Sequence, residues 1–239
     1  TLMKILSGVY QADEGEIFIN GEKVYIENTK KAQQLGISII FQEFNLCPHL
    51  TVADNIWLDR QPKKGPFVDD KKLIEQTQEI LDELGLTISP KALVRTLSVA
   101  EQQMVEIAKA ISFNSKILIL DEPTAALTES EIDRLFNIIH KLKSKGVGMI
   151  YISHRLEELA RIADRVSVLR DGEYLGTYLY KDITIDKLVH LMVGRELNEK
   201  FPVYKRKIGD VLFEARNIIN NKVNVDYIKV RSGEILGIA

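Results

Sequence analysis

One stretch of the chain limits its fold more than any other. Four apolar residues, Ile117 to Leu120, run directly into Asp121 and Glu122, and Pro123 follows. An apolar run without alternation is typical of a strand that is buried on both faces, as in a parallel sheet. In open α/β sheets, ligands bind at the carboxyl ends of the strands. The stretch therefore predicts an α/β fold with a candidate site at the two acids, the alternative being a strand that ends in two solvated carboxylates.

Composition sets the limits of this prediction. The chain has 239 residues, of which 45% are hydrophobic and 28% charged, which suits a globular protein of one to two domains. The net charge of −2 excludes a strong electrostatic attraction to nucleic acid or to a membrane surface. Cys47 is the only cysteine, so no internal disulfide can form. No apolar run approaches the ~18 residues of a membrane span.

Strand and helix patterns alternate along most of the chain. Strands are expected at 36–41, 116–122 and 147–152, and hairpins at 17–24 and 166–178, whose turns are Asn20-Gly21 and Asp171-Gly172. Helices are expected near 69–84, 98–111, 128–145, 154–163 and 184–193, with a loop at 61–66. Capping boxes are expected at Ser98 with Glu101 and at Thr128 with Glu131, and Ser153 is expected to cap a further helix.

Four polar features follow these elements in order: Gln42 after a strand, Ser98 at a helix start, Asp121-Glu122 after a strand, and His154 after a strand. Taken singly, such residues are more often a solvated amide, a structural histidine or a plain helix cap. Together, their local sequences resemble the nucleotide-binding domain of ABC transporters. The segment "IIFQEFNL" resembles the Q-loop, and "LSVAEQQMVEIAKAI" resembles the signature segment. The segment "ILILDEPTAALT" resembles Walker B followed by the D-loop, and "IYISHRLEEL" resembles the H-loop. The segments "TLMKILSGVY", "LTVADNIWL", "VLRDGEYLGT" and "MVGRELNEKFP" resemble the tandem ATPases of bacterial ribose, galactose and xylose importers.

The resemblance implies a P-loop ABC ATPase core, made of a parallel sheet with flanking helices and a small β-hairpin subdomain, plus an all-helical insert. On this basis, residues 1–43 and 113–194 form the core, 44–112 the helical subdomain with the signature, 195–210 a linker, and 211–239 the start of a second ABC ATPase domain.

The resemblance also assigns roles at the strand ends. Asp121 is expected to hold Mg²⁺ together with Gln42, because hard oxygen donors suit that ion. Glu122 is expected to orient or deprotonate the attacking water. His154 is expected to donate to the γ-phosphate of ATP, and Gln42 to sense that phosphate. ATP and Mg²⁺ are the implied cofactors, and Glu122, His154 and Gln42 are the candidate catalytic residues.

The signature segment is the candidate contact to a nucleotide held by an opposing domain, since a helix N-terminus attracts anions. Its candidate nucleotide-binding residues are Ser98, Val99, Ala100, Glu101 and Gln102. The usual signature sequence of the family is Leu-Ser-Gly-Gly-Gln. Val99 and Ala100 replace its two glycines here and reduce the conformational freedom of the backbone. We interpret this change as a feature of the sugar-importer branch.

A phosphate loop needs G-x-x-x-x-G-K-[ST], and no glycine of this chain is followed by lysine. Thr1 resembles the residue just after that loop, and is a further candidate nucleotide-binding residue. The segment 233–239 resembles the strand that leads into the loop of a second domain. Residues 1–239 are therefore expected to be a fragment that lacks Walker A, binds ATP poorly and is inactive by itself, whereas the complete protein is expected to hydrolyse ATP.

The implied partners are membrane permease subunits, the second ABC domain of the same chain and, indirectly, a periplasmic or extracellular sugar-binding protein, with no nucleic acid. The permease contact is expected around Glu43 to Leu50, and the location at the cytoplasmic face of the cell membrane. Two alternatives remain open: a soluble tandem ABC ATPase of translation or DNA maintenance, and a non-catalytic truncated fragment.

Overall fold

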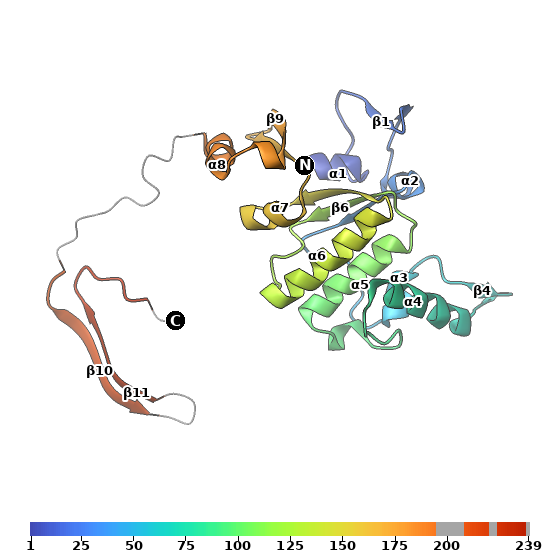
Figure 1. Cartoon of the computed structure of the whole chain (residues 1–239). Helices are drawn as coiled ribbons and strands as arrows, with labels where there is room; N and C mark the ends of the chain where they lie inside the picture. Colours follow the sequence, from blue (N-terminus) through green and yellow to red (C-terminus); the bar gives the residue numbers. More distant parts are fainter. Residues whose placement is uncertain (195–207, 220–223, 238–239) are drawn as a thin grey trace. The chain divides into compact units, whose positions relative to one another are not determined.

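The computed structural model describes residues 1–194, 208–219 and 224–237 (Figure 1). The chain divides into two compact units, Thr1–Val189 and His190–Ala239. All candidate site residues lie in the first unit. Within the described residues, no helix is both long and apolar enough to cross a bilayer.

A three-stranded parallel sheet forms the centre of the first unit. Its strands are β3 (Ile37–Ile40), β6 (Ile117–Asp121) and β7 (Gly148–Ile152), in the order β3-β6-β7. Ile40 pairs with Leu120, and Leu120 pairs with Tyr151, so the three strands end at nearly the same level. The prediction of a parallel α/β sheet with β6 inside it is confirmed.

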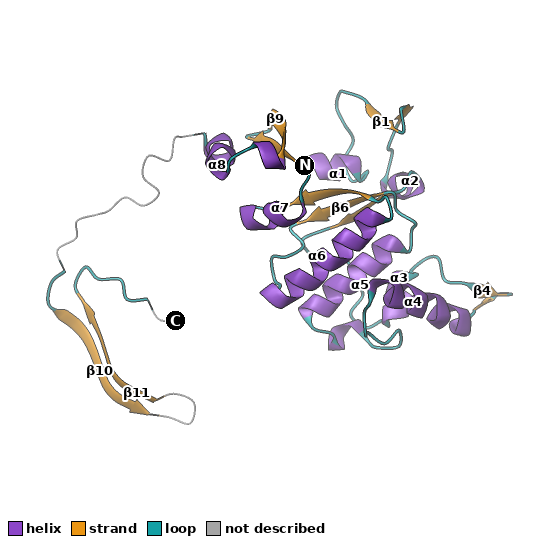
Figure 2. Ribbon diagram, in the orientation of Figure 1, coloured by secondary structure: helices purple, strands orange, loops and turns teal. Residues whose placement is uncertain are grey.

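The apolar run of β6 is buried on both faces. Leu118 and Leu120 pack into a core with helices α3 (Val52–Ile56), α4 (Asp70–Leu84), α5 (Val99–Ile111) and α6 (Glu129–Ser144). Ile119 faces the opposite core, which includes side chains of α1 (Leu2–Leu6) and α2 (Thr29–Gln34). Figure 2 shows α5 and α6 along one face of the sheet and α1 at the other. Because each buried Leu or Ile contributes ~1.5–3 kcal/mol, an unbroken run is favourable only in this two-sided setting.

The strand expected at 147–152 is present as β7, but it is not buried like β6. Gly148 of β7 is exposed, and its other residues are only half-buried. Within the described residues β7 and β3 are both edge strands, but β3 is more buried because helices α2 and α5 pack against it. Helix α7 (Leu156–Ile162) follows β7.

The two predicted hairpins in the first unit are confirmed. β1 (Ile17–Ile19) pairs with β2 (Glu22–Val24), and β8 (Arg165–Arg170) pairs with β9 (Glu173–Leu179). Both turns have positive φ at both central residues, 51° and 83° at Asn20-Gly21 and 54° and 86° at Asp171-Gly172. This is the conformation of a type I′ turn, which Asn-Gly and Asp-Gly favour.

The segment 44–112 contains helices joined by loops, and one short hairpin, so the expectation of an all-helical insert is wrong in that detail. It holds α3, α4, the 3₁₀ helix η1 (Val94–Thr96) and α5. The loop expected at 61–66 instead contributes to a hairpin of β4 (Lys63–Lys64) and β5 (Phe67–Val68), because Gly65 takes the left-handed conformation that closes the turn. Asp69 caps α4, and Gly85 ends it with a φ of 71°, as predicted.

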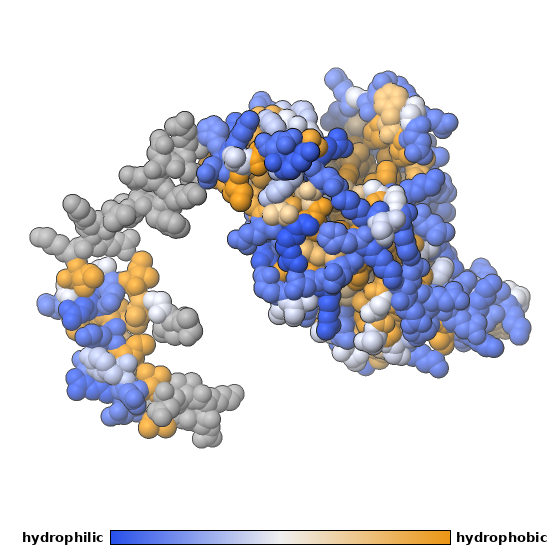
Figure 3. Space-filling model, in the orientation of Figure 1, coloured by the Kyte–Doolittle hydropathy of each residue, from blue (hydrophilic) through white to orange (hydrophobic). Residues whose placement is uncertain are grey.

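The second unit contains one further hairpin. The 3₁₀ helix η2 (Tyr180–Asp182) and α8 (Ile185–Val193) follow β9. β10 (Val211–Ile219) and β11 (Asn224–Arg231) pair in antiparallel fashion. This hairpin exposes apolar side chains, among them Leu212 and Ile219 (Figure 3).

Two expectations concern residues near the end of the chain. Most of the expected linker, residues 195–207, lies outside the described residues, as do residues 238–239. The strand expected from Gly233 onward is not formed over residues 233–237. An apolar pattern makes a strand only where a neighbouring strand supplies backbone partners, and within the described residues none does so.

Candidate functional site

The site lies where the three parallel strands end. Gln42 follows β3 by two residues, Asp121 is the last residue of β6 with Glu122 next, and His154 follows β7 by two residues. Since β3, β6 and β7 are parallel neighbours in nearly level register, these residues lie at the same edge of the sheet. The topology thus brings Gln42, Asp121, Glu122 and His154 to one place, as the sequence predicted.

Glu122 and His154 are in direct contact. Oε1 of Glu122 lies 3.3 Å from Nδ1 of His154. The His154 side chain is 69% exposed and that of Glu122 is 29% exposed, so the pair is open to solvent on the histidine side. A carboxylate and an imidazole at this separation can share a proton or together hold a polar ligand.

The backbone of Glu122 takes an uncommon conformation. Its φ is 48°, in the left-handed region that residues other than glycine rarely adopt. The Glu122 N–H donates to the carbonyl of Ile152 at 3.0 Å, which ties this residue to the end of β7. Strained backbone of this kind persists only where its surroundings hold it, and it is concentrated at functional sites.

The donor set at the strand ends fits a magnesium ion. Asp121 is half-buried and offers a carboxylate, and the exposed Gln42 offers an amide oxygen. In the part of the chain that the structure describes, no group of three or more His, Cys, Asp or Glu could hold a metal by itself. Mg²⁺ typically takes one or two carboxylates and completes its shell with water and substrate phosphates, so a small oxygen donor set suits it.

The signature residues form a separate, local arrangement at the start of α5. The predicted capping box is present: the Ser98 N–H donates to Oε2 of Glu101 at 2.8 Å, and the Glu101 N–H donates to Oγ of Ser98 at 3.3 Å. Gln102 donates to the carbonyl of Leu97, and Val99 is 44% exposed. These hydrogen bonds all lie within the start of the helix. None of them connects the signature residues with the strand ends.

Thr1 directly precedes α1. Its carbonyl accepts from the Ile5 N–H at 3.2 Å. Its side chain makes no cap hydrogen bond to α1.

A buried carboxylate beside the site has no counterpart in the sequence prediction. Glu158 of α7 is 3% exposed and accepts from the hydroxyls of Thr124 at 2.7 Å, Tyr151 at 2.9 Å and Ser153 at 2.7 Å. Burial in this network raises the pKa of the Tyr151 hydroxyl well above its usual range. The only sequence signal was a cluster of hydroxyl residues at two strand ends, which is too common to single out an acid.

The expected cap of α7 by Ser153 is wrong. The N-cap residue is Arg155, and it makes no side-chain cap bond. Oγ of Ser153 instead accepts from the Arg155 N–H at 2.9 Å and donates to Glu158. The N–H from which Ser153 accepts belongs to Arg155, one residue before the first helical residue Leu156, so this bond does not satisfy an N–H of the helix itself.

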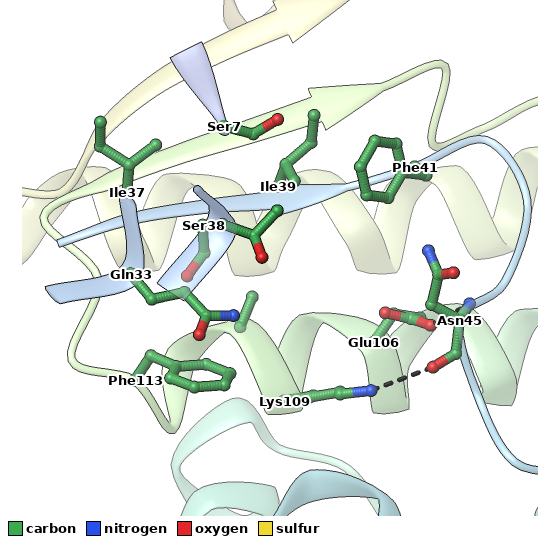
Figure 4. Close-up of a pocket in the computed structure, with 12 residues that line it drawn as sticks. Ser7, Gln33, Ile37, Ser38, Ile39, Phe41, Asn45, Glu106, Lys109 and Phe113 are labelled. Atoms are coloured by element: carbon green, nitrogen blue, oxygen red, sulfur yellow. Dashed lines mark hydrogen bonds between the residues drawn. The ribbon is translucent and has the colours of Figure 1, made fainter. Parts of the chain in front are cut away.

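A small cavity of about 170 Å³ opens between the sheet and the helical subdomain (Figure 4). Phe41 and Asn45 line it from the segment after β3, and Glu106, Lys109 and Phe113 line it from α5 and its end. The Asn45 N–H donates to Oε1 of Glu106 at 2.6 Å, and Nζ of Lys109 donates to the Asn45 carbonyl at 3.0 Å. Burial raises the pKa of the Glu106 carboxyl.

The sequence did not single out Glu106 because it lies off the predicted apolar stripe of α5. That stripe runs through Met104, Ile107, Ala108 and Ile111. The helix is buried more widely than one stripe, since it lies between the sheet and helices α3 and α4. Glu106 is therefore buried although it lies outside the apolar stripe.

Comparison with known proteins identifies the family. The sequence profile of the ABC transporter family matches residues 1–125, which is more than half of the chain. This chain belongs to the ABC transporter family. The residues at the strand ends and at the start of α5 follow one another along the chain in the same order as the motifs on which the resemblance was based.

Several curated relatives match over the whole chain. The putative ribose/galactose/methyl galactoside import ATP-binding protein 1 of Agrobacterium fabrum is 52% identical over 241 residues, which cover 100% of this chain and 48% of the relative. The galactose/methyl galactoside import ATP-binding protein MglA of Escherichia coli K12 is 47% identical over 242 residues, with the same coverages. The chain thus spans about half the length of the curated relatives it matches.

Solved structures of ATP-binding cassettes share the fold. The ADP conformation of MJ1267, an ATP-binding cassette of an ABC transporter, has a TM-score of 0.69 at 23% identity and covers 81% of this chain and 82% of its own. The ATP-binding cassette MJ0796, in a dimeric post-hydrolysis state bound to ADP and Pi, has a TM-score of 0.62 at 25% identity, with 74% and 78% covered. The α/β fold with a parallel sheet is therefore that of an ABC ATPase cassette.

Proposed function

We propose that this chain is part of the ATP-hydrolysing subunit of an ABC importer for sugars. The observation that carries the proposal is the contact between Glu122 and His154 at the ends of two parallel strands, with Asp121 and Gln42 at the same edge. Membership of the ABC transporter family supports it.

In this proposal, Glu122 holds and deprotonates the water that attacks the γ-phosphate of ATP. Proton-transfer catalysis of this kind is worth ~10²–10⁴ in rate. His154, which contacts Glu122, donates a hydrogen bond to the γ-phosphate and stabilises the charge that spreads over its oxygens in the transition state. The contact places the Glu122 carboxylate, which would bind the water, and the His154 imidazole, which would bind the phosphate, close enough to act on the same nucleotide.

Asp121 and Gln42 would hold Mg²⁺ beside these groups. When bound there, the ion would supply positive charge to offset the negative charge of the phosphate groups. Gln42 carries no charge of its own, so it can approach both the ion and the water and change its position when the γ-phosphate leaves.

Ser98, Val99, Ala100, Glu101 and Gln102 are proposed to bind a nucleotide that another ABC domain holds, and Thr1 the nucleotide of its own domain. The start of α5 supports the first assignment: α5 is 13 residues long, and Val99 at its beginning is exposed. The N–H groups at such a helix end attract phosphate. On this assignment, hydrolysis requires two domains to close on each other, with the core at 1–43 and 113–194 and the signature subdomain at 44–112.

A sugar as the transported substrate is proposed from the relatives. Both named relatives are sugar import ATP-binding proteins by name, and both match along the entire chain. The same names favour the importer over a soluble tandem ATPase. We place the subunit at the cytoplasmic face of the membrane, bound to permease subunits, with a sugar-binding protein on the opposite side.

The permease is proposed to contact the segment Glu43 to Leu50 and the adjoining cavity. Glu43 is exposed, and the cavity is lined by the polar residues Asn45 and Lys109 and by two aromatic residues, Phe41 and Phe113 (Figure 4). A concave surface of mixed polarity beside Gln42 is suited to transmit the state of the nucleotide to a partner. Glu43→Lys should uncouple transport from hydrolysis, whereas Glu79→Lys on the exposed side of α4 should not.

The test of the overall proposal uses the full-length protein. Purified protein should release phosphate from ATP in the presence of Mg²⁺, and EDTA should abolish the release. In proteoliposomes with its permease and sugar-binding protein, hydrolysis should rise when the sugar is added. Absence of Mg²⁺-dependent hydrolysis would refute the enzymatic proposal, and hydrolysis that responds to no sugar would refute the transport proposal.

A further inference from the structure

Glu158 lies at the centre of a hydrogen-bond network behind the strand ends. Its Oε1 accepts from the Thr124 hydroxyl at 2.7 Å and lies 3.1 Å from Nη1 of Arg155. Its Oε2 accepts from the hydroxyls of Tyr151 at 2.9 Å and Ser153 at 2.7 Å. The side chain is 4% exposed, so four protein groups replace water around this carboxylate.

The partners of Glu158 flank both members of the Glu122–His154 pair. Thr124 is two residues after Glu122, and Ser153 and Arg155 are the immediate neighbours of His154. Arg155 adds a second link, because its Nη2 donates to Oε1 of Glu129 at 2.9 Å, at the start of α6. One buried carboxylate thus joins the turn after β6 to the turn after β7.

The turn after β6 needs such a support. Glu122 has a φ of 48°, and a residue other than glycine stays in that conformation only where its surroundings hold it. The hydrogen bond from Thr124 to Glu158 fixes the turn two residues further on, and the Glu122 N–H fixes it to Ile152.

We propose that Glu158 is a positioning residue that holds Glu122 and His154 at their mutual distance for hydrolysis. This inference rests on the function proposed above for those two residues. Glu158 touches neither of them and acts through Thr124 on one side and Ser153 and Arg155 on the other.

A glutamine at position 158 separates this role from simple packing. Glu158→Gln keeps the size and shape of the side chain, but its amide nitrogen donates and cannot accept. At least one of the hydroxyls now bound to the carboxylate must lose its acceptor or turn, and Arg155 loses its ion pair with residue 158. The two turns are then free to shift relative to one another.

The matched control is Glu157→Gln. Glu157 is the preceding residue in the first turn of α7 and is exposed, so its substitution makes the same charge change at the same helix end without removing a hydrogen bond of the network; it acts on Arg155 through charge alone. In the full-length protein, Glu158→Gln should lower kcat about 10–100-fold with KM for ATP changed less than about threefold, because misplacement of reacting groups by about 1 Å costs rate rather than ground-state binding. Glu157→Gln should leave both constants within about twofold of the parent.

A second measurement reads the position of His154 without activity. In full-length protein labelled with ¹³C at histidine, the ring resonance of His154, assigned by its loss in His154→Gln, should shift in Glu158→Gln and stay in place in Glu157→Gln. An unmoved His154 resonance, or a kcat equal to that of Glu157→Gln, would overturn the inference. If the parent protein itself hydrolyses no ATP, the proposed function fails, while the resonance still decides whether Glu158 positions His154.

If Glu158→Gln fails to fold by circular dichroism, Thr124→Val provides the same test with a smaller change. It preserves volume and removes one of the four groups on the carboxylate. It should lower kcat several-fold at unchanged KM, and an unchanged kcat would overturn the inference.

Discussion

Oε1 of Glu122 lies 3.3 Å from Nδ1 of His154, and the Glu122 N–H also donates to the carbonyl of Ile152, two residues before that histidine. The two residues are therefore held together by side chain and by backbone. Neither bond is available until β6 and β7 pair in parallel, so the contact is a direct product of the sheet. A carboxylate and an imidazole placed in this way are suited to act on one ligand.

The first prediction concerns Glu122 itself. In the full-length protein, Glu122→Gln should lower ATP turnover ~10²-fold or more, because an amide cannot take a proton from water. ATP binding should be retained, since the amide still fits the site. Phosphate release measures the first effect, and equilibrium binding of labelled ATP measures the second.

The control for this substitution is Glu173→Gln, an exposed position of β9. It changes the same charge away from the strand ends and should leave turnover unaltered. If Glu122→Gln also hydrolyses ATP at the parental rate, Glu122 does not have the proposed role.

The second prediction separates the two possible roles of Ser98. Ser98 and Asp69 are both N-caps, of α5 and α4, and each accepts from a backbone N–H with its side chain. Ser98→Ala and Asp69→Ala should each cost about 0.5–2 kcal/mol of stability, the usual value of an N-cap. Only Ser98→Ala should also reduce ATP hydrolysis, measured at a temperature where both variants are folded. Equal hydrolysis by the two variants would leave Ser98 a cap alone.

The sequence predicted most of the fold because its strongest signals are local or two-sided. The unbroken run of β6 is buried on both faces, the Asn20-Gly21 turn has the required positive φ values, and Ser98 forms its capping box. The degree of burial escaped prediction: β7 carries the same kind of apolar run as β6 but is only half-buried, whereas β3, the other edge strand within the described residues, is covered by α2 and α5. Burial of a strand depends on the elements that pack against it, which its own residues do not determine.

The same distinction holds for the site. The placement of Gln42, Asp121, Glu122 and His154 at one edge of the sheet could be predicted because each lies within two residues of a strand end, and parallel strands end together. Glu158 could not, because its partners come from three segments and its neighbours in sequence give no sign of burial. A buried carboxylate is recognised only when the groups that satisfy it are seen around it.

The third prediction follows from the raised pKa of Glu106, whose main cause is burial; Lys109 and the Asn45 N–H act in the opposite direction. A carboxyl with a folded-state pKa above its unfolded value favours folding when it is protonated. Its contribution is fully present below the unfolded pKa and is lost as pH rises through the folded pKa. Glu106→Gln keeps an acceptor for Asn45 and removes this loss.

Glu106→Gln should therefore raise the urea midpoint at pH 7 relative to the parent, and the difference should shrink as the pH falls toward 4. Glu79→Gln, at an exposed position of α4, should show no such trend. A Glu106→Gln midpoint that falls below the parental value at neutral pH would mean that the electrostatic attraction to Lys109 outweighs the cost of burial.

The last prediction concerns two glycines that end helices in the same backbone conformation. Gly8 has a φ of 75° and Gly146 a φ of 83°, so alanine is strained at both by about 1–2 kcal/mol. The surroundings differ: a Cβ at Gly8 would lie 2.4 Å from the backbone carbon and oxygen of Asn28, whereas nothing lies within 4 Å of one at Gly146. Asn28 caps α2 by accepting from the Lys31 N–H, so it cannot move away without loss.

Gly8→Ala should therefore destabilise the protein clearly more than Gly146→Ala, by about 2–4 kcal/mol against about 1 kcal/mol. Thermal unfolding followed by circular dichroism measures the difference, and hydrogen exchange should show its effect at the start of α2. Equal melting temperatures for the two variants would mean that the approach of Gly8 to Asn28 relaxes at no cost. Both substitutions would then cost only the strain of the backbone conformation that the two glycines share.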